Sequence, residues 1–228
     1  MGKAPAKKAL KPPKSEMVVF DVEQNSPEWF DCRRGIPTAS VMSTVMASGR
    51  DGGASVTRTK LLHKLAGEII TEEVAADGYR NAAMEKGKAL EDEARQSYAR
   101  RKKAEVRRIG FVRNFSGLKT CGASPDGWVG FDGGLEIKIA TEAHIIIPML
   151  QHPAKMPSEH KAQVMANIWV CEKDWWDLTI FFHRSMPAVD VRVFRDDVYI
   201  REMSNEVEKF NWELKKLTEQ LRSMGAAG

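Results

Sequence analysis

The chain has 228 residues, 43% of them hydrophobic and 29% charged, which suits one large domain with a substantial core. No stretch approaches the roughly 18 uninterrupted apolar residues of a membrane-spanning helix, and three cysteines without a C-x-x-C pair argue against a disulfide framework, a zinc site or an iron–sulfur cluster. The net charge of +4 depends on five lysines within residues 1–14; without them, 30 basic side chains face 31 acidic ones, so overall charge identifies no partner.

Residues 1–16 are predicted to be a disordered basic tail, and residues 17–228 a single domain. The tail lacks the apolar segment of a signal peptide, and Ala6 stands where a myristoylation signal has Ser or Thr. A solvated leader is the simpler interpretation of its lysines, and a non-specific tether to DNA is the alternative.

Helices dominate the first part of the domain. A β-prone run at 17–22 precedes a Ser-Pro-Glu sequence at 26–28, which supplies a helix cap, a proline at the first helical position and an acidic first turn. That helix should end near Gly35. A Thr-Ala-Ser sequence at 38–40 should open a second helix, and the apolar spacing predicts a third over 59–74.

A charged helix is predicted over residues 81–103. One face carries, at steps of three and four residues, Met84, Gly87, Glu91, Ala94 and Tyr98. Burying an unpaired carboxylate costs several kcal/mol, so Glu91 requires a metal ion, a base or a hydrogen-bond donor. The alternative places Glu91 at the edge of the face, in contact with water.

The second part is predicted to contain a sheet and closing helices. Strand-like runs occupy 109–115, 118–123, 128–131 and 135–139, followed by a loop with three prolines, a helix over 158–170, and strands over 177–182 and 189–194. The last helix carries an apolar stripe of Val207, Phe210, Leu214, Leu217, Leu221 and Met224. The predicted fold class is α/β (α+β), with a central mixed sheet flanked by helices.

The chemistry is concentrated between residues 124 and 138. Glu136 and Lys138 lie two residues apart on one strand and therefore on the same face, and a hairpin at 132–134 brings Asp126 beside them. Two carboxylates suit Mg²⁺, and an ammonium group beside them suits the orientation or deprotonation of a water molecule. An exposed strand with an incidental Glu–Lys pair is the alternative.

The motifs resemble those of a known nuclease superfamily. Pro-Asp at 125–126 with Glu-x-Lys at 136–138 is similar to the PD-(D/E)-x-K nucleases, which have a restriction-endonuclease-like core. The wider pattern resembles the lambda exonuclease (YqaJ-type viral recombinase) family. It comprises Trp29, the Arg-Arg-Gly-Ile-Pro-Thr-Ala-Ser block at 33–40, Gly-Lys-Ala-Leu-Glu at 87–91, Ala-Gln-Val at 162–164 and Trp169. These blocks keep their order from about residue 20 to residue 220.

The resemblance implies roles for particular residues. The implied catalytic set is Asp126, Glu136, Lys138, Glu91 and Gln163. The implied metal ligands are Asp126, Glu136, the backbone carbonyl of Ile137 and Glu91, the last directly or through water, around Mg²⁺ in a two-metal site that also accepts Mn²⁺. The implied pocket for a DNA 5′-phosphate consists of Arg33, Ser40 and Ser124. Ser40 would lie in the opening turn of a helix, where free N–H groups favour anions, and a simple helix cap is the alternative.

The resemblance also implies a function. We expect a processive 5′-to-3′ exonuclease that acts on double-stranded DNA ends and leaves 3′ overhangs for phage-type recombination. A homotrimeric ring, a single-strand annealing protein as partner, no membrane association, and a phage or prophage origin with action in the bacterial cytoplasm are further expectations. The alternative is a PD-(D/E)-x-K endonuclease of the restriction or repair type, which would not need the 5′-phosphate pocket. The intact Asp126, Glu136 and Lys138 argue against a degenerate binding protein.

Three features remain open. The family's additional phosphate-binding arginine is missing from residues 140–144, so His144, when protonated, or Arg33 alone would have to hold the terminal phosphate. The basic run at 100–108 is either a DNA-backbone patch or a solvated helix end. His152, His160 and His183 show no metal-binding spacing and are expected to be surface or hydrogen-bonded residues.

Overall fold

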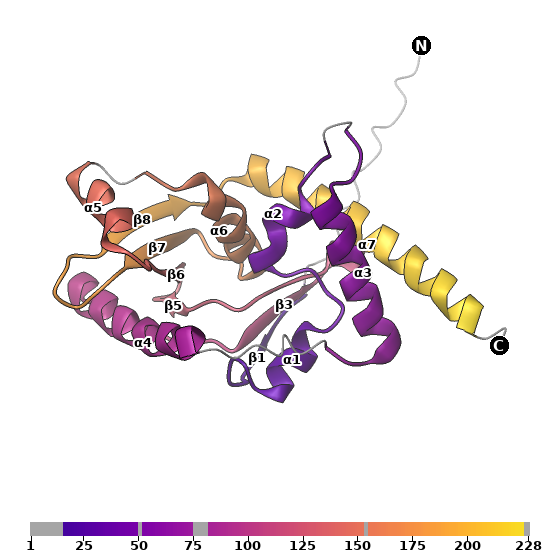
Figure 1. Cartoon of the computed structure of the whole chain (residues 1–228), viewed down its shortest axis with the longest axis horizontal. Helices are drawn as coiled ribbons and strands as arrows, with labels where there is room; N and C mark the ends of the chain where they lie inside the picture. Colours follow the sequence, from indigo (N-terminus) through magenta and orange to yellow (C-terminus); the bar gives the residue numbers. More distant parts are fainter. Residues whose placement is uncertain (1–15, 50–51, 75–81, 153–154, 226–228) are drawn as a thin grey trace, which may run out of the picture.

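Two β-sheets form the centre of the fold (Figure 1), in a computed structural model that describes residues 16–49, 52–74, 82–152 and 155–225, with the backbone alone for 82–89. The three-stranded sheet has the order β1 (Glu16–Phe20), β3 (Phe111–Phe115) and β4 (Cys121–Ala123). The five-stranded sheet has the order β2 (Val106–Arg107), β5 (Gly127–Val129), β6 (Gly133–Ile139), β7 (Trp175–Phe181) and β8 (Val189–Phe194). Strands β6 and β7 run parallel and the other pairs antiparallel, so the predicted mixed sheet is confirmed. The strand-like runs predicted at 17–22, 109–115 and 118–123 supply the strands of the separate three-stranded sheet.

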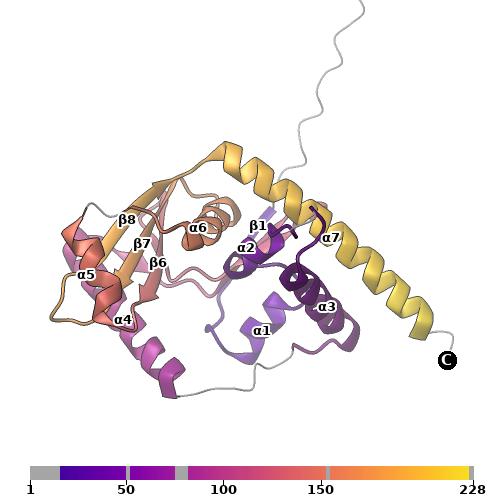
Figure 2. The same ribbon diagram turned by 45° about the horizontal axis from the view of Figure 1, so that its top comes forward.

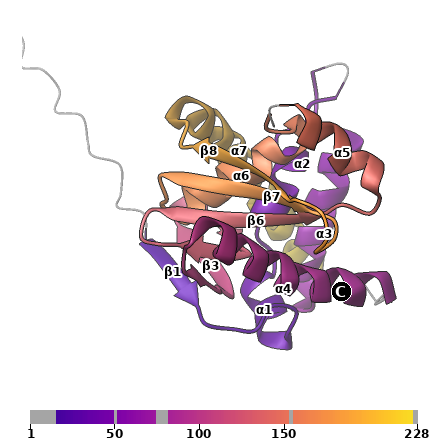
Figure 3. The same cartoon turned by 90° about the vertical axis from the view of Figure 1, so that its left-hand side faces the viewer.

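The helices are α1 (Pro27–Arg33), α2 (Met42–Val45), α3 (Val56–Thr71), α4 (Ala82–Lys102), α5 (Ala143–Gln151), α6 (Ser158–Val170) and α7 (Asp197–Gly225), with 3-10 turns at Ala39–Val41 and Gly117–Lys119. Helix α4 covers one face of the five-stranded sheet, and α5 and α6 lie on the other (Figure 3). Within the described residues, no helix is both long and apolar enough to cross a membrane.

The alternation along β6 determines which side chains face each layer. Leu135 and Ile137 pack with Tyr98 of α4, so Glu136 and Lys138 face the opposite layer, toward α6. The ring of Trp176 lies so close to β6 that a Cβ on Gly134 would be 2.2 Å away from it. Only glycine therefore fits immediately before the segment that carries the two polar side chains.

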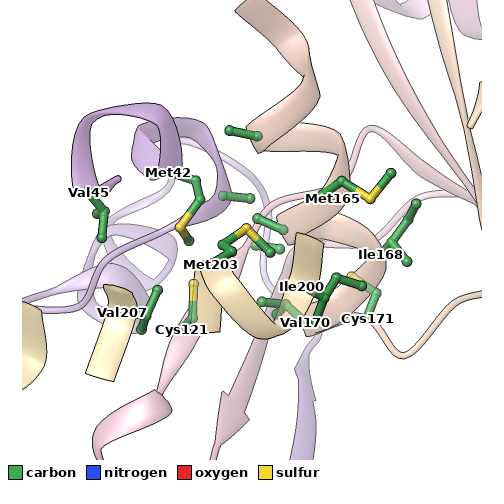
Figure 4. Packing of buried hydrophobic residues seen from close by; sticks show 14 of the residues in the cluster. Met42, Val45, Cys121, Met165, Ile168, Val170, Cys171, Ile200, Met203 and Val207 are labelled. Carbon is green, nitrogen blue, oxygen red and sulfur yellow. The ribbon is translucent and has the colours of Figure 1, made fainter. Parts of the chain in front are cut away.

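Helix α6 is surrounded by the main core (Figure 4). Its buried apolar residues pack with Met42 and Val45 of α2, Cys121 of β4 and Met203 of α7. Because this side of α6 is enclosed, Gln163 and Asn167 require partners within the fold, and the site described below supplies them.

One predicted helix start and one predicted strand start differ in part from the structure. The chain at Pro37 and Thr38 is extended, because the Pro37 carbonyl accepts from the Gly122 N–H at 3.0 Å and Thr38 bridges to Gly122. The predicted helix at 38–40 therefore opens with a 3-10 turn, for which Thr38 is the N-cap, and α2 follows from Met42. Leu118, predicted in a strand, lies in the second 3-10 turn, where Gly117 has a φ of 57°.

The prediction of a proline-containing loop before α6 was also wrong in part, since residues 143–151 form helix α5 with Pro148 inside it. An internal proline costs a helix about 3 kcal/mol. Burial of Ile146 against Leu178, Ile180 and Val189 offsets that cost. The periodicity of a nine-residue apolar run does not reveal this packing.

The ends of the domain differ slightly from expectation. Glu16, assigned to the tail, pairs with Phe115 in β1, and residues 1–15 lie outside the described residues. The last helix buries Val207, Phe210 and Leu214 as predicted. However, Leu221 and Met224 are 37% and 66% exposed, because α7 extends beyond the rest of the fold (Figure 2).

Candidate active site

The β5–β6 hairpin brings Asp126 beside Glu136. Gly127 is the first residue of β5 and pairs with Leu135, so Asp126 lies just before β5, where β6 continues with no partner among the described strands on that edge and β7 on the other. The Asp126 Oδ2 atom takes the place of a strand partner and accepts a hydrogen bond from the Ile137 N–H at 2.6 Å. The Ile137 carbonyl faces the same edge of the strand as its N–H and therefore the same side as Asp126.

Glu136 is 4% exposed, and both oxygens of its carboxylate accept hydrogen bonds. Its Oε1 atom accepts from Lys138 Nζ at 2.8 Å and from Gln163 Nε2 at 2.6 Å, and its Oε2 atom accepts from Asn167 Nδ2 at 2.9 Å. Lys138 Nζ also donates to Gln163 Oε1 at 2.9 Å. The structure thus joins Glu136, Lys138 and Gln163 in one network. The sequence analysis missed Asn167, which lies one turn after Gln163 on a buried helix.

Glu91 lies next to the site but bonds an arginine. Arg95, 8% exposed, donates from Nη2 to Glu91 Oε1 at 2.5 Å and from Nη1 to Asp92. Its Nε donates to the Asp126 backbone carbonyl at 2.8 Å. Glu91 therefore has the hydrogen-bond donor that its position on the uncharged face required. Arg95 was not identified from the sequence, although it lies four residues after Glu91 on the same helix.

The electrostatics of the site fit a divalent cation. The pKa of Asp126 is raised well above its usual range, first by burial, then by the charges of Glu136 and Glu91. Burial also raises the pKa of Glu136, while Lys138 and Asn167 oppose that shift. Burial and mutual repulsion thus disfavour the ionised form of these carboxyl groups, a cost that a bound cation would offset, and hard oxygen ligands suit Mg²⁺.

The ligand set would consist of Asp126, Glu136 and the Ile137 carbonyl. Among the residues that the structure describes, no group of three or more His, Cys, Asp or Glu side chains is placed to hold a metal ion. Glu91 bonds Arg95, as noted, so a contribution from Glu91 would have to pass through water or require a different partner for Arg95.

The three residues predicted to bind a phosphate also come together. Arg33 Nη1 donates to Ser124 Oγ at 2.9 Å, and Nη2 lies 3.5 Å from Thr38 Oγ1. Thr38 Oγ1 is in turn 3.2 Å from Ser40 Oγ. Trp29 donates from Nε1 to Ser124 Oγ at 3.0 Å and lies under the Arg33 guanidinium, 4.1 Å from its ring centroid. Trp29 and Thr38 were not predicted members of this pocket.

Arg33 carries a partly buried charge that is hydrogen-bonded to hydroxyl groups. Burial lowers the pKa of Arg33 to about 10, against the effect of Glu68, so the guanidinium remains charged near neutral pH. Glu68 itself accepts from the Gly35 N–H at 3.0 Å. Among the described side chains, those that accept from Arg33 are Ser124 and Thr38. A partly buried guanidinium with hydroxyl partners is suited to binding an anion.

The remaining candidates lie elsewhere. His144 is exposed at the start of α5 and is 3.0 Å from Glu142, so the structure gives no contact between it and the Arg33 pocket. In the basic run at 100–108, Arg101 and Lys102 pair with Asp190, which favours a structural role for them.

Comparisons with known proteins identify the family and the fold. The sequence model of the YqaJ-like viral recombinase domain matches residues 28–174. Two structures of LHK-Exo, an alkaline exonuclease from Laribacter hongkongensis, one in complex with dAMP, are 28% identical to the chain with a TM-score of 0.76, covering 89% of this chain and 99% of theirs. A phage related exonuclease from Haemophilus somnus 129PT is 12% identical with a TM-score of 0.62, covering 83% and 96%, and shows the fold alone. No curated protein matches the chain.

Proposed function

The chain belongs to the YqaJ-like viral recombinase family, and from this membership we propose that it is an exonuclease acting on the ends of linear double-stranded DNA. We further propose that it depends on Mg²⁺, with Mn²⁺ as a substitute, and digests the 5′-ended strand processively. The product would be a 3′ overhang used for recombination by strand annealing. The resemblance to an alkaline exonuclease over 99% of that chain supports the exonuclease part of the proposal.

One observation carries the proposal: the phosphate pocket and the catalytic cluster share a turn. Ser124, which accepts from Arg33, and Asp126, which accepts from Ile137, are separated by Pro125 alone. Two residues span at most about 7 Å of chain. A terminal phosphate held by Arg33 would therefore lie close to the bond being cut, which is the arrangement that an exonuclease with a 5′-phosphate requirement needs.

The side chains of the cluster have distinct roles in hydrolysis. When bound, Mg²⁺ would neutralise the carboxylates and activate a water molecule. Lys138 uses two of its N–H groups on Glu136 and Gln163, and an ammonium group has three donors, so one is available to a water or a phosphate oxygen. Gln163 fixes the position of Lys138 by bonding both it and Glu136.

Digestion of three substrates tests the proposal against the endonuclease alternative. Linear duplexes with 5′-phosphate or 5′-hydroxyl ends are incubated beside a covalently closed circle, with Mg²⁺ or with EDTA. We expect loss of the linear substrates, faster for the phosphorylated one, an intact circle, and no reaction in EDTA. Cutting of the circle would support an endonuclease of the restriction or repair type instead.

The proposal also includes an oligomeric state and a partner protein. A homotrimeric ring around the duplex would provide processivity without a strongly basic surface, in keeping with the near-neutral body of the chain. A single-strand annealing protein would take up the 3′ overhang. Light scattering across micromolar concentrations tests the ring, because a monomer mass at all of them would rule it out.

A further inference from the structure

One face of helix α6 is aligned with strand β6. Residues 160, 163 and 167 are separated by steps of three and four, so they lie along one side of the helix. Asn167 bonds Glu136, and Gln163 bonds both Glu136 and Lys138. Residues nearer the N-terminus of α6 therefore lie nearer to Lys138, and residues nearer its C-terminus lie nearer to Glu136.

His160 is the next residue in this series, at the Lys138 end. Its imidazole is half-buried, and its place one turn before Gln163 on the same side of α6 puts it at the end of the network where Gln163 bonds Lys138. In keeping with this position, burial first and then the Lys138 charge lower the pKa of His160, against the effect of Glu159. Its backbone N–H donates to the Pro157 carbonyl at 3.1 Å. In the described part of the chain, no side chain or carbonyl is hydrogen-bonded to the ring, whereas Gln163 and Asn167 are both engaged.

A half-buried imidazole with this lowered pKa is neutral near neutral pH and has one N–H donor and one acceptor. The neighbouring Lys138 supplies a cation, so the two together offer a charged and a neutral donor at the open end of the network. Phosphate oxygens of a DNA strand accept both kinds of hydrogen bond.

We propose that His160 is a substrate-contacting residue, whose ring N–H donates a hydrogen bond to a phosphate oxygen of the strand being cut, next to Lys138. This inference rests on the proposed nuclease function and adds to it a residue outside the predicted catalytic set. The sequence analysis expected His160 to be a surface or hydrogen-bonded histidine.

The test compares single-turnover cleavage of a 5′-phosphorylated duplex by the full chain and by His160→Ala and His160→Gln, at saturating Mg²⁺. His63→Ala, an exposed histidine on α3, is the matched control. Loss of a hydrogen bond to a charged group should slow His160→Ala by about 10- to 100-fold. Glutamine keeps an N–H donor and should recover part of the rate, and His63→Ala should equal the wild type.

Two further measurements separate this role from a structural one. Mg²⁺ affinity by calorimetry and the melting temperature should be unchanged in both His160 variants, because His160 neither ligates the cation nor bonds the fold through its ring. A His160→Ala rate within twofold of an active wild type would overturn the inference alone. A wild type that leaves every DNA substrate intact would overturn the proposed function, and the inference with it.

Discussion

Arg33 donates a hydrogen bond to Ser124 at 2.9 Å, across 91 positions of sequence. The bond connects the end of helix α1 to the turn that carries Asp126. The bond joins the anion pocket to the catalytic cluster, although Arg33 lies near the start of the predicted domain and the cluster in its middle. An Arg33 variant tests the anion pocket, and variants of the carboxylates and of Lys138 test the catalytic cluster.

Arg33→Ala should weaken the preference for 5′-phosphorylated ends. A partly desolvated contact between a guanidinium group and a phosphate contributes about 1.5–3 kcal/mol, or roughly 10- to 150-fold in affinity. Cleavage rates on 5′-phosphate and 5′-hydroxyl duplexes should converge, while both still require Mg²⁺. Arg34→Ala is the matched control, because Arg34 bonds Asp31 and the Glu72 carbonyl at the surface.

A purely structural Arg33 would give a different result. The melting temperature would fall, and both substrates would lose rate equally. Since Asp31 pairs with Arg34, it does not supply the ion pair that this account needs for Arg33.

Lys138→Ala should abolish cleavage and leave Mg²⁺ binding largely intact, because an ammonium group does not ligate a cation. Loss of a proton-transfer or charge-stabilising group lowers rates by at least about 10²-fold. Single-turnover kinetics at saturating Mg²⁺ measure this, and a wild-type rate would remove Lys138 from the mechanism.

Asp126→Ala and Glu136→Ala should instead lose metal affinity by calorimetry; unchanged binding in both would place the metal elsewhere.

Arg95→Met should reduce both stability and activity. Its side chain holds the Asp126 carbonyl and Glu91 together, so its loss leaves partly buried acceptors without donors, at a cost of about 1–3 kcal/mol. Urea denaturation and cleavage rates should both change. Arg101→Met is the control on the same helix, since Arg101 bonds Asp190 and Ser97 away from the site. Equal activity losses in the two variants would deny Arg95 a specific role.

Without metal, stability should fall as the pH rises. The pKa of Asp126 and that of Glu136 are higher in the folded chain than in the unfolded one, so the folded state holds more protons between those values. The free energy of unfolding then decreases from about pH 4 upward, through the raised folded pKa. Thermal melts in EDTA should show this decrease, with a smaller one in Asp126→Asn. Mg²⁺ should reverse it, and a flat profile in EDTA would contradict the assigned shifts.

The local patterns predicted much of the site. The two-residue spacing of Glu136 and Lys138 set their common face. The helix predicted over 158–170 has the bounds observed, and it carries Gln163, which the family resemblance had singled out. Such features depend on residues close in sequence. Arg95 and Thr38 were missed because their importance depends on Asp126 and Arg33, whose positions relative to them are decided by the tertiary fold.

Helix α5 was missed for a related reason. A proline in a short apolar run indicates a loop when only the local sequence is considered. The decisive contact, Ile146 against the sheet, is with residues more than 30 positions away. The second sheet likewise depends on the pairing of β1 with β3, which no local pattern reveals.

The bond between Asn167 and Glu136 has a consequence for how this sequence can change over generations. Asn167 is 1% exposed, so its amide has no access to solvent, and Glu136 is its acceptor. A descendant that lost the Glu136 carboxylate would leave a buried amide unsatisfied and Lys138 without its counter-charge. Substitution at this position therefore lowers stability as well as activity, and an inactive descendant that kept the original stability would need compensating changes at Asn167 and Lys138.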